Sequence, residues 1–94
     1  MTKILERYSG RKIKEGMKDY FLENAEELDE TFLMKERIST NIKALIFVEK
    51  DTFCVRLVRA NKMTAGRFLI VNALSDAAVK SLDKKMDIFF EKKE

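Results

Sequence analysis

The amino-acid sequence predicts an α+β domain in which a four-stranded antiparallel meander lies between an N-terminal and a C-terminal helix (α-β-β-β-β-α). Apolar residues recur at spacings of three and four near both ends of the chain, as in amphipathic helices. Between these stretches lie short β-branched and aromatic runs separated by a few polar residues, as in antiparallel hairpins. The 94 residues have the length of one domain (1–94), and we interpret 1–9 as a short arm or helix.

The first predicted helix covers residues 11–29. Gly10 separates it from the preceding arm, because glycine is unfavourable inside helices. Its apolar positions follow the helical period: Ile13, Met17, Tyr20, Phe21, Ala25 and Leu28. We therefore expect a long amphipathic helix before the sheet.

Strands are predicted in residues 32–38, 42–49, 52–60 and 67–74. In the first strand two series alternate, Phe32, Met34 and Ile38 against Leu33, Lys35 and Arg37. Residues 39–41 have the composition of a turn, Lys50-Asp51 predicts a tight hairpin, and residues 61–66 predict a loop. These connections favour strands that pair with their neighbours in sequence.

The second predicted helix follows Ser75, whose hydroxyl group is suited to an N-cap. Apolar residues at helical spacing form its stripe: Ala78, Val79, Leu82, Met86, Phe89 and Phe90. The charged residues 91–94 are expected to fray.

Residues 42–48 and 68–71 are apolar at successive positions, so the second and fourth strands carry apolar side chains on both faces. An antiparallel sheet with one face in water alternates instead, so both faces of this sheet require a cover. Two arrangements satisfy this requirement. The helices lie on opposite faces of a monomer, or both lie on one face and a second copy covers the other. We expect the second arrangement, a homodimer.

Composition excludes several functional classes. The chain has no histidine and one cysteine, which excludes a disulfide scaffold, a Cys/His zinc site and a His-based catalytic triad. The lone thiol, Cys54, lies within a predicted strand and lacks an activating histidine. We expect no enzymatic activity, no cofactor and no metal. The free cysteine, the absence of a signal-peptide pattern and the short apolar runs predict a cytoplasmic protein without a membrane span.

An acidic segment predicts the preferred function, which is protein binding. Residues 19–30 contain Asp and Glu but no Lys or Arg, although the formal net charge of the chain is +3. Such a segment steers a protein towards a cationic partner. The predicted protein-binding residues are Asp19, Glu23, Glu26, Glu27 and Glu30. We expect a small regulatory inhibitor or accessory factor, of a kind encoded by phages and other mobile elements, that occupies a partner's surface.

The alternative prediction is a single-stranded nucleic-acid-binding protein that uses the basic sheet segment. Cations on a sheet face follow a phosphate backbone while aromatic rings stack on bases. The candidate residues are Lys43, Arg56, Arg59, Lys62 and Arg67, with Phe47 or Phe53 as stacking residues. A net charge of +3 is low for such a protein, and both phenylalanines lie in apolar contexts typical of a core.

Overall fold

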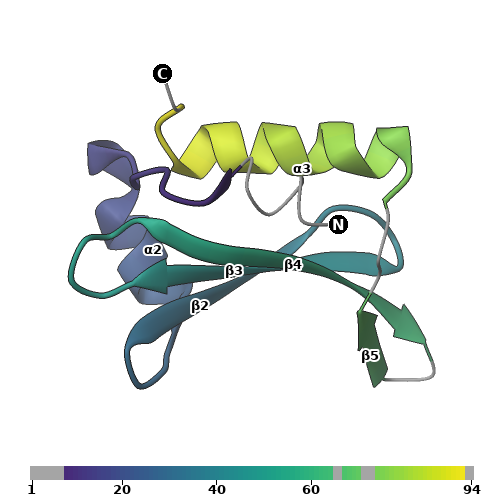
Figure 1. Ribbon diagram of the computed structural model, residues 1–94, viewed down its shortest axis with the longest axis horizontal. Coiled ribbons are helices and arrows are strands. Elements are labelled where there is room, and N and C mark those ends of the chain that lie inside the picture. The colour runs from purple at the N-terminus through teal and green to yellow at the C-terminus, as the bar shows by residue number, and fades with distance from the viewer. Residues whose placement is uncertain (1–7, 65–66, 71–73, 93–94) are drawn as a thin grey trace.

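An antiparallel sheet organises the chain, and a C-terminal helix lies across one of its faces (Figure 1). The computed structural model describes residues 8–64, 67–70 and 74–92. In these residues the strand order is β1-β2-β3-β4-β5, with β1 at Glu26–Glu27, β2 at Thr31–Arg37, β3 at Ile42–Glu49, β4 at Val55–Thr64 and β5 at Arg67–Ile70. The helical elements are η1 at Glu15–Met17, α2 at Lys18–Asn24 and α3 at Asp76–Phe89. The predicted α+β class and the antiparallel meander between two helices are confirmed.

The hydrophobic core lies between α3 and the sheet. Alternate residues of β2, β3 and β4 point towards α3, so that Met34, Ile46 and Val58 are buried. The helix contributes the buried stripe Ala78, Leu82, Met86 and Phe89. Its N-cap is the predicted one, because the Ser75 hydroxyl accepts a hydrogen bond from the Ala78 backbone nitrogen at 3.2 Å.

The first helix is much shorter than the predicted 11–29. Residues 11–14 are extended and lie between the start of β4 and the end of α3, with Ile13 fully buried. The Ile13 nitrogen donates to the Phe53 carbonyl at 2.9 Å, and the Lys14 nitrogen donates to the Phe89 carbonyl at 2.8 Å. These long-range bonds replace the hydrogen bonds that a helix would supply.

The C-terminal part of the predicted first helix forms β1 instead. Glu26 and Glu27 pair with Leu33 and Phe32 of β2. The helix that remains, α2, buries Phe21, which packs edge-on against Phe32 at 5.8 Å between ring centroids. Tyr20 of α2 also stacks on Phe89 of α3 at 5.6 Å. Both helices therefore contact the same side of the sheet.

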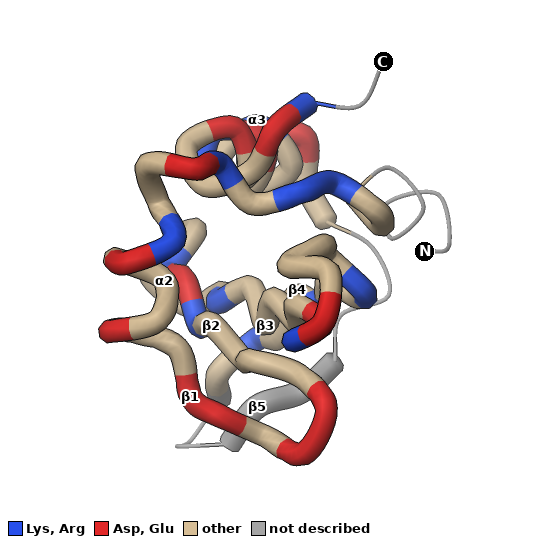
Figure 2. The backbone as a smooth tube through the Cα atoms, turned by 90° about the vertical axis from the view of Figure 1, so that its left-hand side faces the viewer, with Lys and Arg blue, Asp and Glu red and all other residues tan. Residues whose placement is uncertain are grey.

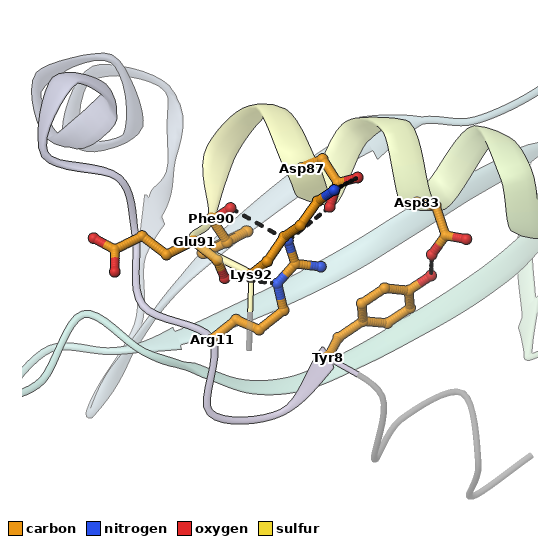
Figure 3. A network of polar contacts seen from close by, with 7 residues as sticks. All are labelled: Tyr8, Arg11, Asp83, Asp87, Phe90, Glu91 and Lys92. Atoms are coloured by element: carbon orange, nitrogen blue, oxygen red, sulfur yellow. Dashed lines mark hydrogen bonds and ion pairs between the residues drawn. The ribbon is translucent and has the colours of Figure 1, made fainter. Parts of the chain in front are cut away.

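A buried arginine joins the extended N-terminal segment to α3 (Figure 3). Arg11 donates at 2.8 Å to Asp87, at 2.8 Å to the Glu91 carbonyl and at 3.3 Å to the Phe90 carbonyl. The hydrogen bond from Arg11 holds the pKa of Asp87 below its ordinary value. Nearby, the Tyr8 hydroxyl donates to Asp83. These bonds fix residues 8–14 along the helix.

The connections after β3 differ from the predicted ones. Residues 50–54 separate β3 from β4. The third predicted strand, which corresponds to β4, therefore starts at Val55 rather than at residue 52. Phe53 has a φ of 54°, a left-handed conformation that the predicted tight hairpin at Lys50-Asp51 does not include. Strand β4 continues to Thr64 through most of the predicted loop, and β5 covers 67–70. The predictions for residues 1–7, 65–66, 71–73 and 93–94 lie outside the described residues.

Candidate functional site

The surface of interest is the side of the sheet that faces away from α3. We call it the open face and define its centre by Leu33, Leu45, Phe47 and Leu57. Leu33 and Leu57 are both register partners of Phe47, on the two neighbouring strands, and Leu45 is two residues from Phe47 on β3. Directly paired residues share a face, so these side chains form one apolar group. All of them are half-buried. No helix in the described part of the chain covers them (Figure 1).

Cations occupy one end of the open face, next to the β2–β3 turn. In the register, Leu45 lies between Lys35 and Arg59, and Arg37 pairs with Lys43. We call Lys35, Arg37, Lys43 and Arg59 the basic end. Glu36 lies between Lys35 and Arg37 on β2, so its side chain is on the other face of the sheet. There it forms an ion pair with Lys85 of α3 at 3.4 Å.

Carboxylates occupy the other end. Glu26 pairs with Leu33, and Glu49 pairs with Thr31, so both belong to the open face. The adjoining turns add Asp29, Glu30 and Asp51, which with Glu49, Lys50 and Arg56 line a cavity of about 540 Å³. We call Glu26, Asp29, Glu30, Glu49 and Asp51 the acidic end. Figure 2 shows acidic positions along β1 and the turn after it.

Between the two ends the surface is hollowed. A depression of about 280 Å³ is lined by Thr31, Phe47, Arg56, Leu57 and Arg59. The register between β3 and β4 shifts at Phe47/Val48, so that Arg56 is an extra residue on β4. This irregularity lets Arg56 line both the central depression and the cavity at the acidic end.

This arrangement is suited to binding a partner through non-covalent contacts. An apolar centre releases water on contact with a partner, and its charged ends set the partner's orientation. In the described residues no group of three or more His, Cys, Asp or Glu side chains is placed to hold a metal ion. Within the same residues, none of the helices combines the length and apolar character that crossing a membrane requires.

The predicted acidic residues lie on several elements and do not share one face. Asp19 and Glu23 are exposed on α2, and Glu30 is exposed in the β1–β2 turn. Strand pairing turns Glu26 towards the open face, and its neighbour Glu27 towards the opposite one. There Glu27 forms an ion pair with Lys50 at 3.0 Å.

The predicted cations are also divided. Lys43 and Arg59 belong to the basic end, and Arg56 lies at the bulge. Lys62 pairs with Ile42, which packs against the core, so Lys62 is on the α3 side of the sheet. Arg67 pairs with Thr64, and its side chain lies outside the described part.

Sequence reasoning missed five charged residues of this surface and misplaced one aromatic residue. The missed residues are Asp29, Lys35, Arg37, Glu49 and Asp51, although the alternation in residues 32–38 already placed Lys35 and Arg37 with Leu33. Phe47 was expected in the core but lies half-buried on the open face. Phe53 does pack inward, with its ring 6.1 Å from that of Phe32.

No protein-family model matches the chain, and comparisons with curated proteins and with solved structures give no match either.

Proposed function

We propose that this chain is a small, non-enzymatic, intracellular protein-binding module that acts as an inhibitor or accessory factor by occupying a surface of a partner protein. The observation that supports this proposal is the apolar centre of the open face. Contiguous apolar surface of this kind is typical of protein interaction sites. Its composition also favours a protein partner, because three of its four members are leucines, which offer contact area but no stacking platform.

The predicted acidic residues have a second role in this proposal. Asp19 and Glu23 on α2 and Glu30 in the β1–β2 turn are exposed and lie outside the apolar centre. Exposed carboxylates accelerate the approach of a cationic partner without being buried in the final contact. The open face would then supply affinity and the acidic residues would supply association rate.

Leu45→Asp tests the protein-binding proposal. The new carboxylate lies between its register partners Lys35 and Arg59, so favourable cross-strand pairs support the fold of the variant. A charge in the centre of an interface is strongly unfavourable, and we expect at least a tenfold loss of bound protein. The measurement is affinity capture from host lysate, with immobilised wild type and variant compared side by side.

The matched control is Ile88→Asp, which makes the same kind of exchange at an exposed site on α3, where Ile88 is 52% exposed. This control should capture as much protein as the wild type. Equal capture by all three proteins would refute the open face as a binding surface. Far-UV circular dichroism of each protein shows that the comparison is between folded chains.

Single-stranded nucleic acid is the second candidate, because the aromatic ring of Phe47 lines the same depression as Arg56 and Arg59. On this proposal Phe47 stacks on a base, and Arg59 with Arg56 contacts phosphates. The double variant Arg56→Glu/Arg59→Glu should abolish a mobility shift of oligonucleotides at ~50 mM salt, where phosphate contacts are strong. If the wild type gives no shift under these conditions, this candidate is refuted.

A further inference from the structure

The open face has a charge pattern that complements itself. On the central strand β3 the outward residues are, in order, Lys43, Leu45, Phe47 and Glu49. This order is cation, apolar, apolar, anion. When a second copy of β3 is stacked on the first in the opposite direction, the anion of each strand lies over the cation of the other. The apolar residues of the two strands then lie over one another. The midpoint of the pattern is Ile46, which lies between the two apolar residues.

Strands β2 and β1, on one side of β3, have the same polarity, whereas β4 on the other side carries Arg59 towards the basic end and Arg56 towards the acidic end. On β2 the basic residues Lys35 and Arg37 lie on the Lys43 side of this midpoint. Glu26 of β1 pairs with Leu33 and lies on the Glu49 side. Within the described residues, Glu26, Arg37, Lys43 and Glu49 take part in none of the ion pairs of the chain. Their charges therefore remain available to a surface that approaches the open face.

We infer that a second copy of this chain occupies the open face, with a two-fold axis that lies in the interface, crosses the strands and passes over Ile46. This inference rests on the proposed function, because it names the partner of that protein-binding surface. The axis places Lys43 of each copy against Glu49 of the other, and Leu45 against Phe47. Lys35 then lies near Glu26 of the second copy.

The geometry of sheets is compatible with this packing. A two-fold interface is isologous, so one self-complementary patch serves both copies. Two sheets of the same twist stack face to face with their strands within about 30° of each other, and their inner side chains interdigitate. The two-fold axis gives both sheets the same twist by construction. The parallel alternative places the two basic ends together and the two acidic ends together, which is unfavourable.

Charge reversal at each end tests this arrangement. In the basic-end variant, Arg37→Glu and Lys43→Glu give β3 an outward carboxylate at position 43 as well as at Glu49. In the acidic-end variant, Glu26→Lys and Glu49→Lys give β3 an outward cation at position 49 as well as at Lys43. Sedimentation equilibrium should show a wild-type dimer, and about a tenfold or greater weakening in either variant. The control for the basic-end variant is Lys80→Glu/Lys84→Glu, which makes the same change in net charge at exposed positions of α3 and should dimerise like the wild type.

The decisive measurement mixes the two variants. In a mixed pair, the carboxylate introduced by Lys43→Glu faces the ammonium introduced by Glu49→Lys on one side of the axis, and the unchanged Glu49 faces the unchanged Lys43 on the other. Native mass spectrometry should therefore detect a heterodimer in preference to either homodimer. A variant that had merely lost its fold would not recover in the mixture. The salt dependence gives the orientation: the antiparallel wild-type dimer weakens between ~0.1 M and ~1 M salt as screening grows, whereas a parallel dimer would strengthen.

Three results would overturn the inference: a monomeric wild type, homodimers that persist in both reversal variants, or a mixture without heterodimer. The proposed function has a separate outcome. If the wild type is monomeric but captures a host protein that Leu45→Asp does not capture, the second copy is excluded and the protein-binding face remains. If the wild type is monomeric and Leu45→Asp captures the same proteins, both proposals are refuted.

Discussion

At the scale of single residues, Arg11 has the largest set of polar contacts in the described chain, and its ion pair makes stability depend on pH. Its guanidinium group, on a side chain only 6% exposed, lies 2.8 Å from Asp87. The hydrogen bond from Arg11 lowers the pKa of Asp87 from 3.8 in the folded state. A carboxyl whose folded pKa is depressed stabilises the fold above its ordinary pKa. This contribution is lost as the pH falls through the lower, folded value.

We therefore expect Asp87→Asn to lower the free energy of unfolding near pH 7, because it removes the charge that pairs with a buried arginine. The difference from the wild type should shrink as the pH falls through the lowered pKa of Asp87, because the wild-type carboxyl group is then protonated as well. Urea denaturation at pH 7 and at a series of acidic pH values measures this difference. Glu23→Gln, at an exposed carboxylate on α2, is the control. A difference that stays constant with pH would show that the Asp87 charge does not stabilise the fold.

At the scale of elements, helices and strands were predicted correctly from the sequence where one face of the element packs on a single neighbour. Helix α3 was predicted correctly because its apolar stripe faces a single surface and Ser75 caps it. Strands β2 and β3 were predicted within a residue because their side chains alternate between a buried and an open face.

The prediction was wrong where apolar residues at helical spacing pack against different parts of the chain rather than against one surface. Ile13, Phe21 and Leu28 have helical spacing, yet Ile13 belongs to an extended segment beside Phe90 and Leu28 follows a strand. Their burial comes from distant parts of the chain, which local spacing does not encode. The same reason explains Arg56, whose place on the surface depends on a bulge that only the pairing of β4 with β3 defines.

The candidate surface was partly predictable for the same physical reasons. The two-sided apolar character of residues 42–48 correctly indicated that β3 has apolar residues on both faces. In the described part of the chain, α3 covers one of these faces and no helix covers the other (Figure 1). This is the arrangement expected when both helices lie on one face of the sheet. The order of charges along the open face was not predicted, because it appears only when the register aligns Lys35 with Leu45 and Leu33 with Glu26.

At the scale of the whole molecule, self-association through the open face would make the stability of each chain depend on protein concentration. Folded dimers that unfold to separate chains are stabilised by mass action. A hundredfold increase in concentration corresponds to about 1.4 kcal/mol per chain. For a domain of this size that is an increase in Tm of about 5–10 °C.

We expect this increase for the wild type and for Ile88→Asp, because the control site on α3 is remote from the open face. Leu45→Asp should melt at the same temperature at every concentration, since its carboxylate prevents two apolar centres from meeting. Calorimetry on the three proteins across that range measures the effect. A wild-type Tm that does not change with concentration would mean that the apolar centre stays in contact with water in a stable single chain. The leucines around Phe47 would then be available to a different protein rather than to a second copy.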